Sequence, residues 1–283
     1  MRLIDGRAIA AQANGSTSRE VADLRSAGVQ PRLTVVFPGK DEAAAWYVRS
    51  IERLSKKVGI DCRVDELPDA TDDQVAERLA TLSADPSVHG IICQTPLPSG
   101  GSLHRIAGHI APAKDVDGAS PASLGALAVG LPAFAPATAQ AVLEILGHEN
   151  VPLTGSRAVV VGRSAVVGKP VALMLMAENA TVTVCHSRTA DLAGTCAQAD
   201  VLVVAIGRAR LVGAPHVKPG AVVVDVGTNP TPDGLAGDVD QEAIAGVAAA
   251  LTPVPGGVGP VTTAMLLRNV AAAARAAHAD GTL

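Results

Sequence analysis

The sequence predicts an α/β protein with two domains and buried parallel β-sheets, and three observations lead to this fold class. The chain has 283 residues, more than a single hydrophobic core usually organises. Short apolar runs rich in Val and Ile alternate with helix-like segments along its length, a pattern typical of buried parallel strands. Hydrophobic residues make up 48% and charged residues 18%, which is ample for packed cores and unlike a disordered chain.

The positions of the apolar runs give the expected elements in order. The expected strands are residues 33–37, 90–94, 158–162, 181–185, 201–206 and 221–227. Residues 261–278 are rich in Ala and Leu with few breakers and are expected to form a helix.

Two loops rich in Pro and Gly suggest where the domains meet. They lie at 130–138 and 252–260 and bracket the last four expected strands. We therefore expect an inserted domain of the dinucleotide-binding type at 141–260, within a first domain that comprises 1–140 and 261–283.

Composition also argues against several classes of partner. Aromatic residues form only 1% of the chain and the formal net charge is −4, so a nucleic-acid partner is not expected. The N-terminal sequence MRLIDGRAIA lacks the features of a signal peptide, and no apolar run approaches ~20 residues. We expect a cytoplasmic protein without a membrane segment. The histidines and the four cysteines are dispersed, so we expect neither disulfides nor a metal site; the cysteines are Cys62, Cys93, Cys185 and Cys196.

A glycine-rich turn indicates where a dinucleotide would bind. The sequence GRSAVVGKP, from Gly162 to Pro170, lies between an expected strand and a helix-like segment. Such a turn lets the backbone approach a pyrophosphate at a helix N-terminus. Ser164 stands where the usual fingerprint has its second glycine, so a tight turn with no ligand is an equally good interpretation of this segment alone.

The end of the next expected strand distinguishes between cofactors. NAD-specific sites have an acidic residue here that binds the ribose hydroxyl. This chain has CHSRT, which places Ser187 and Arg188 there, and Arg163 lies in the glycine turn. Guanidinium groups suit a 2′-phosphate, so NADP is predicted over NAD. The alternative is that both arginines are simply solvated at loop ends.

Several motifs together resemble the bifunctional methylenetetrahydrofolate dehydrogenase/cyclohydrolase family over nearly the whole chain. They are QTPLP at 94–98, KDVDG at 114–118, GRSAVVGKP at 162–170, CHSRT at 185–189, VVDVGTN at 223–229 and TPVPGGVGP at 252–260. The resemblance implies a folate-binding α/β domain built from both chain ends, a Rossmann-like NADP-binding domain and a homodimer. It implies oxidation of 5,10-methylenetetrahydrofolate to the methenyl compound with reduction of NADP. Bifunctional members then hydrolyse the methenyl compound to 10-formyltetrahydrofolate.

The resemblance also assigns roles to individual residues. Tyr47 is similar to the tyrosine that stacks on or orients the folate, and Asp117 to the residue that hydrogen-bonds the pterin. Gln94 is similar to the glutamine that positions a catalytic lysine. The implied NADP-contacting positions are Gly162, Arg163, Ser164, Ser187, Arg188 and Thr228, and the implied substrate-contacting positions are Tyr47, Cys93, Gln94, Thr95, Asp117, Pro255, Gly256, Gly257, Val258 and Gly259.

One departure from the family pattern bears on chemistry. The family helix contains YxxxK, whereas Ile51 occupies the lysine position here. Hydride transfer requires positioning rather than a proton-transfer residue, so it can survive this change. Hydrolysis benefits by ~10²–10⁴-fold from a positioned base and should fall sharply. Smaller departures are Thr95, Thr228 and the PATA sequence at 136–139.

The sequence thus favours an NADP-dependent methylenetetrahydrofolate dehydrogenase with weak or lost cyclohydrolase activity. One alternative is a full bifunctional enzyme in which water or Gln94 compensates for the lysine. Others are a non-catalytic folate- or NADP-binding paralogue and a Rossmann oxidoreductase acting on a carbonyl, which normally needs a paired Tyr and Lys as its general acid.

Overall fold

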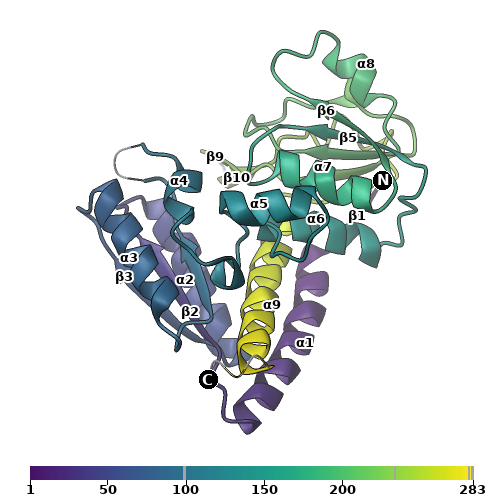
Figure 1. Cartoon of the computed structure of the whole chain (residues 1–283). Coiled ribbons are helices and arrows are strands. Elements are labelled where there is room, and N and C mark those ends of the chain that lie inside the picture. The colour runs from purple at the N-terminus through teal and green to yellow at the C-terminus, as the bar shows by residue number, and fades with distance from the viewer. Residues whose placement is uncertain (98–99, 233, 280, 282–283) are drawn as a thin grey trace. The chain divides into compact units, whose positions relative to one another are not determined.

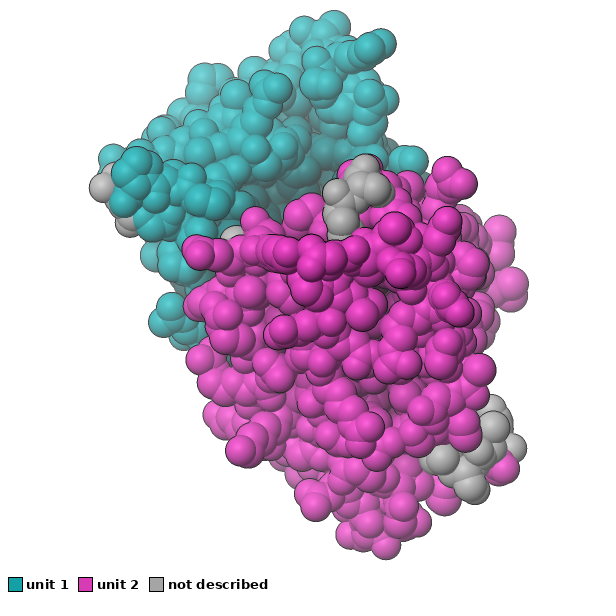
Figure 2. All heavy atoms as spheres, turned by 90° about the vertical axis from the view of Figure 1, so that its left-hand side faces the viewer, with its two compact units in different colours: residues 1–11, 138–262 teal, residues 12–137, 263–283 magenta. Residues whose placement is uncertain are grey.

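The computed structural model describes residues 1–97, 100–232, 234–279 and 281 of the chain. These residues form two compact units, each with its own parallel sheet (Figures 1 and 2). Unit 1 comprises Met1–Ala11 and Thr138–Thr262, and unit 2 comprises Gln12–Ala137 and Thr263–Leu283. The two-domain α/β fold expected from the sequence is confirmed.

Unit 1 is built on a six-stranded parallel sheet in the order β1-β11-β8-β7-β5-β6. Its strands are β1 (Arg2–Leu3), β5 (Arg157–Val161), β6 (Thr181–Cys185), β7 (Val201–Val204), β8 (Val222–Asp225) and β11 (Ala250–Leu251). An antiparallel hairpin, β9 (Asn229–Thr231) with β10 (Gly234–Ala236), follows β8. The helices are α6 (Ala137–His148), α7 (Gly168–Ala177), α8 (Leu192–Cys196) and the 3₁₀ helix η2 (Ala214–His216).

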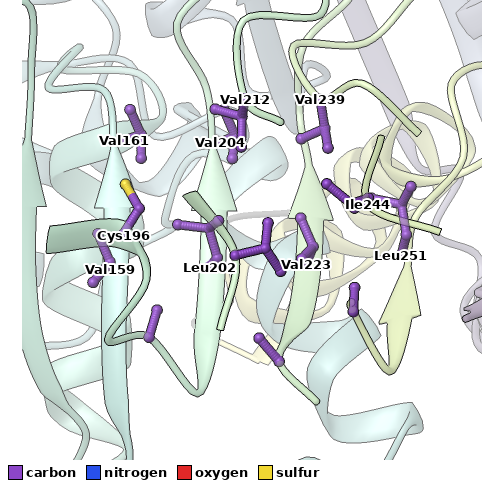
Figure 3. Packing of buried hydrophobic residues seen from close by; sticks show 14 of the residues in the cluster. Val159, Val161, Cys196, Leu202, Val204, Val212, Val223, Val239, Ile244 and Leu251 are labelled. Carbon is purple, nitrogen blue, oxygen red and sulfur yellow. The ribbon is translucent and has the colours of Figure 1, made fainter. Parts of the chain in front are cut away.

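The core of this unit follows from the runs of valine in its strands. Val159, Leu202, Val223 and Leu251 belong to four different strands, and their side chains meet in one buried cluster (Figure 3). Helix α7 packs against β5 and β6 (Figure 1). The central strands β5 and β7 are buried and almost entirely apolar, as expected for strands covered on both faces, whereas the edge strand β6 alternates Thr with Val and is mostly exposed.

The first residues of the chain belong to unit 1, whereas the sequence placed residues 1–140 entirely in the other domain. Backbone pairing explains why these residues group with unit 1. Arg2 and Leu3 lie in register with Ala250 and Leu251 and extend the sheet by one short strand. A two-residue strand has no periodicity of its own, so its partner is visible only in the tertiary structure.

Unit 2 is built on a three-stranded parallel sheet in the order β3-β2-β4. The strands are β2 (Arg32–Phe37), β3 (Asp61–Glu66) and β4 (Gly90–Cys93), and the helices are α1 (Gly6–Ser26), α2 (Glu42–Val58), α3 (Asp72–Ala84), α4 (Leu103–Ala107), η1 (Pro112–Lys114), α5 (Pro121–Ala128) and α9 (Val258–Ala279). Helix α1 begins within unit 1 and α9 begins there too; both continue into unit 2. Right-handed crossovers from β2 to β3 and from β3 to β4 run in opposite directions, which places α2 and α3 on opposite faces of the sheet.

Neither a membrane-spanning helix nor a metal-ligand cluster occurs in the described residues. None of the helices in that part of the chain combines the length and apolar character needed to cross a membrane. Within the same ranges, no three His, Cys, Asp or Glu side chains are grouped as metal ligands would be.

Candidate active site and nucleotide site

Helix α2 fixes the position of Tyr47. The helix begins after Asp41, whose carboxylate accepts a hydrogen bond from the Ala44 amide at 2.8 Å, and it ends at Gly59 in the left-handed conformation. One face of the helix is buried; its members are Ala44, Val48, Ile51, Ser55 and Val58. Tyr47 lies at the margin of this face and is half-buried.

The Tyr47 hydroxyl lies in an apolar and negatively charged environment. Burial raises its pKa most, the Asp117 carboxylate raises it further, and a hydrogen bond with Thr263 of α9 lowers it. The tyrosine is therefore a neutral hydrogen-bonding group at physiological pH. Three segments distant in sequence meet at this point: helix α2, the KDVDG loop and helix α9.

The KDVDG loop is held by its first aspartate. The Asp115 carboxylate is fully buried and accepts hydrogen bonds from the amides of Ala119 and Ser120, at 3.0 and 2.9 Å, and from Ser123 Oγ at 2.6 Å. Asn269 of α9 donates to the carbonyl of Val116 at 2.8 Å. These bonds fix the backbone on both sides of the second aspartate.

Gly118 gives the same loop its close approach to a neighbouring segment. Its φ is 56°, and an added Cβ would overlap the backbone of 134–136. Only glycine fits here without strain. The loop is consequently docked on the segment that leads into the PATA sequence and includes its first residue, Pro136.

Asp117 occupies a position suited to proton exchange near neutral pH. Burial raises the pKa of its carboxyl to about 7, the amide of Ala137 donates to Oδ1 at 3.3 Å and lowers it, and Asp115 raises it. A carboxyl of this kind can donate or accept a hydrogen bond at a ligand nitrogen. The structure thus places Asp117 near enough to Tyr47 for its charge to raise the pKa of the tyrosine.

The end of strand β4 contributes the QTPLP motif. The backbone N–H of Gln94 donates to the carbonyl of Val36 and continues the strand register. Its side-chain Nε2 donates to the carbonyl of Thr95 at 3.1 Å. Burial, followed by the charge of Asp72, raises the pKa of the Cys93 thiol to about 12, so this thiol is not a nucleophile. Thr95 is exposed. Pro98, the last residue of the motif, lies outside the described residues.

In unit 1, the turn after β5 has the geometry of a phosphate-binding loop. Gly162 has a φ of 129°, and an added Cβ would overlap the carbonyl oxygen of Ala205. A Cβ at Gly168 would overlap the carbonyl of Gly162. Ser164 Oγ accepts hydrogen bonds from the amides of Val167 and Gly168 at 3.2 and 3.3 Å, so the serine stabilises the start of α7. The close backbone approach is what a pyrophosphate site requires.

A second loop lies beside this turn. Strands β5 and β6 are neighbours, and Gly162 N donates to the carbonyl of Cys185 at 2.9 Å. The chain then turns at His186, whose Nδ1 accepts from the Arg188 amide at 3.2 Å. Ser187 and Arg188 are exposed at this edge, as are Arg163 and Ser164. A glycine cradle beside a hydroxyl and two guanidinium groups fits a dinucleotide with a 2′-phosphate.

Two buried carboxylates, which the sequence analysis did not single out, hold the loops that follow β7 and β8. Asp225, at the end of β8, accepts from the amides of Gly227, Asp238 and Val239 at 2.9 to 3.0 Å. Asp238 accepts from three amides of the loop after β7, at residues 206–208. Burial raises the pKa of Asp225 to about 6. The sequence signal for Asp225 was an aspartate at the end of an otherwise apolar strand. Thr228 follows three residues later and is exposed.

The glycine loop at 255–259 belongs to unit 1, and its last two residues are the first of helix α9. A Cβ at Gly257 would lie 2.6 Å from the carbonyl oxygen of Pro253, and a Cβ at Gly6 would overlap the Gly257 carbonyl. Gly256 has a φ of 108°. Pro255 and Gly256 precede the buried Val258, and Gly259 continues the helix. Tyr47 and Asp117 belong to unit 2, so the structure groups this loop separately from them.

Comparisons with known proteins assign both units. Residues 4–117 match the model of the tetrahydrofolate dehydrogenase/cyclohydrolase catalytic domain, and residues 136–278 match that of the tetrahydrofolate dehydrogenase/cyclohydrolase NAD(P)-binding domain. The chain belongs to the tetrahydrofolate dehydrogenase/cyclohydrolase family.

Individual members of this family are similar over their full length. A "Bifunctional protein FolD" of Parafrankia sp. (strain EAN1pec) is 60% identical over 97% of this chain and 99% of that protein. The crystal structure of the bifunctional FolD from Campylobacter jejuni has a TM-score of 0.95 at 39% identity and covers 98% of this chain and 99% of its own. A Trypanosoma brucei FolD, solved with NADP cofactor and an inhibitor, has a TM-score of 0.92 at 37% identity, with 97% of both chains covered.

Ile51 occupies the position at which the sequence analysis expected a lysine. Its side chain is 0% exposed, and it follows Tyr47 by one helical turn on the buried face. Packing therefore accounts fully for an apolar residue here. Arg49 and Arg53 are exposed and lie on another face of the helix, so neither replaces a lysine at this position.

Proposed function

We propose that this protein oxidises 5,10-methylenetetrahydrofolate to 5,10-methenyltetrahydrofolate with NADP. The observation that supports this most is the Asp117 carboxyl, whose charge raises the pKa of Tyr47 and whose own pKa is about 7. The resemblance to the family gives this carboxyl a pterin as its partner. The tyrosine ring would orient the folate, and the two groups together would fix the pterin at one angle.

The cofactor preference rests on the loop after β6. No carboxylate follows Cys185 within CHSRT, and Ser187, Arg188 and Arg163 are exposed at one sheet edge. When bound, the nicotinamide supplies the hydride acceptor. The chain's own contribution is to bind the pyrophosphate at Gly162 and the 2′-phosphate at the guanidinium groups. The NADP present in the Trypanosoma brucei structure supports the same choice.

A second candidate function is hydrolysis of the methenyl product to 10-formyltetrahydrofolate. The names of the relatives favour it, because the Parafrankia protein and the Campylobacter jejuni enzyme are both called bifunctional. These names support a bifunctional dehydrogenase/cyclohydrolase better than a monofunctional dehydrogenase. The buried Ile51 argues that hydrolysis here proceeds without a lysine and with a lower rate, using Asp117 or water held near Tyr47 for proton exchange.

One series of assays separates these possibilities. NADP-dependent formation of the methenyl compound is measured first, with NAD as the comparison, and equal kcat/KM for the two cofactors would remove the argument from Arg163 and Arg188. Decay of methenyltetrahydrofolate is then followed with and without the protein in one buffer. Decay that matches buffer alone identifies a monofunctional dehydrogenase, and clear acceleration identifies the bifunctional enzyme. NADP binding without turnover of either folate identifies a non-catalytic paralogue.

We also propose that the protein is a cytoplasmic homodimer, as the family resemblance implies. Light scattering on the purified protein tests the dimer, and cell fractionation tests the location. A monomer at micromolar concentration would refute the first of these.

A further inference from the structure

In unit 1, the loop after strand β7 follows the point where the order of the strands reverses. Strands β6 and β7 lie on opposite sides of β5, and both pair with it in parallel. The chain therefore leaves β5 for one side of the sheet and returns on the other. A dinucleotide binds at such a reversal, outside the carboxyl ends of the strands. Figure 3 shows those ends of β5 and β7, marked by Val161 and Val204, side by side.

The loop after β7 is in direct contact with the glycine turn after β5. The amide of Ala205 donates to the carbonyl of Val161 at 2.8 Å. The carbonyl oxygen of Ala205 is also the group that a Cβ at Gly162 would overlap. Arg208 follows Ala205 by three residues, so their Cα atoms lie at most ~11 Å apart. Arg208 therefore stays at the same edge of the sheet as the glycine turn.

Asp238 fixes the backbone of this loop. Its carboxylate is fully buried and accepts hydrogen bonds from the amides of Ile206, Gly207 and Arg208, at 2.7, 3.0 and 2.7 Å. Asn229 Nδ2 donates to the same carboxylate at 2.9 Å. Because the three amides are already bonded within the protein, they are not free to bind a phosphate. What the loop can offer to an anion is a charged side chain.

Arg208 supplies that charge. It is exposed, and the ion pairs found within residues 1–97, 100–232 and 234–279 do not include it. A guanidinium presents a planar fork of donors that fits two phosphate oxygens at once. Since Asp238 already holds the backbone in place, less conformational entropy is lost when the side chain binds. The loop thus presents an unneutralised cation beside the glycine turn.

We propose that Arg208 binds the pyrophosphate of the nicotinamide cofactor, on the opposite side of β5 from the 2′-phosphate. This rests on the proposed function, because it takes the ligand to be a dinucleotide held at Gly162. The groups proposed for the 2′-phosphate include Ser187 and Arg188, which follow β6, whereas Arg208 follows β7. The pyrophosphate is the anionic group that NADP and NAD share. Arg208 therefore strengthens the binding of both cofactors, while Arg188 distinguishes between them.

The expected effect of removing the Arg208 side chain is an equal loss of affinity for the two cofactors. Without this charge-assisted contact to phosphate, the Kd should rise about tenfold for NADP and for NAD. The loss should shrink with salt, because the screening length falls from ~10 Å at 0.1 M to ~3 Å at 1 M. The Tm of the free protein should stay unchanged, since Asp238 bonds to the backbone of Arg208 and not to its side chain.

The test compares Arg208→Ala with Arg188→Ala and with the control Arg157→Ala. Arg157 is an exposed arginine at the first residue of β5, at the opposite edge of the sheet, so its loss changes the net charge equally. The Kd values for NADP and for NAD are measured by titration calorimetry at 0.1 M and 1 M salt, without folate. Oxidation of methylenetetrahydrofolate by the parent protein is measured separately.

Each outcome decides something about Arg208. A Kd that rises by the same factor for NADP and NAD in Arg208→Ala, and keeps its parent value in Arg157→Ala, would support the proposal. A rise for NADP alone, as expected for Arg188→Ala, would overturn it, and so would no rise or an equal rise in Arg157→Ala. If the parent protein binds NADP but oxidises no methylenetetrahydrofolate, the proposed reaction fails, and the calorimetry still decides the role of Arg208. A parent protein that binds neither dinucleotide would reject both proposals.

Discussion

Replacement of Asp117 by Asn should stabilise the protein at high pH while abolishing turnover. The Asp117 carboxyl has a pKa of about 7 in the folded protein, against an ordinary value of 3.8, chiefly because it is buried. A raised carboxyl pKa means that the folded state holds the proton more tightly than the unfolded state. This contribution to stability is fully present below pH 3.8 and is lost as the pH rises through about 7.

The size of the effect follows from the two pKa values. Each pH unit between them corresponds to ~1.4 kcal/mol, so the rise from 3.8 to about 7 sets an upper limit of about 4 kcal/mol. Asn is neutral at every pH and has nearly the same shape. The free energy of unfolding of Asp117→Asn, relative to the parent protein, should therefore increase by about 1–4 kcal/mol between pH 4 and pH 8.

Urea unfolding at a series of pH values measures this difference, and Asp73→Asn, an exposed position on α3, is the matched control. The control should show no comparable change with pH. A difference between parent and Asp117→Asn that is the same at pH 4 and pH 8 would refute the argument from burial. Near-normal oxidation of methylenetetrahydrofolate by Asp117→Asn, or by Asp117→Ala, would refute the assignment of this carboxyl to the pterin.

Three further substitutions test the other parts of the structure. Ile51→Ala should cost about 2–5 kcal/mol in unfolding free energy, because it removes a fully buried side chain, and a cost under 1 kcal/mol would contradict the burial. Gly162→Ala should raise the Kd for NADP at least tenfold and lower the Tm, since the new Cβ would overlap the Ala205 carbonyl at a φ of 129°; calorimetry showing unchanged binding would contradict this. Arg188→Ala should lower kcat/KM with NADP by about tenfold and leave that with NAD unchanged, and an equal loss with both cofactors would mean that the guanidinium does not contact a 2′-phosphate.

The sequence predicted the elements whose own composition determines them. Strands β5, β7 and β8 are runs of valine and leucine that only a buried position accommodates, and they form where they were expected. The glycine turn at Gly162 was likewise predictable, because a strand followed by glycines and a helix has few alternative conformations. Strand β3, DCRVDE, was missed because it is an edge strand in which only Cys62 and Val64 are apolar among four charged residues, too few to give a periodic signal.

The sequence by itself determined the fold class, the two sheets and the family motifs, because local composition and periodicity are properties of neighbouring residues. The tertiary structure alone decided that Met1–Ala11 joins unit 1 through the pairing of Arg2 with Ala250. It alone decided the pKa of Asp117, which depends on burial beneath segments far away in the chain. Desolvation and strand pairing are set by which residues meet in space, and no window along the sequence contains that information.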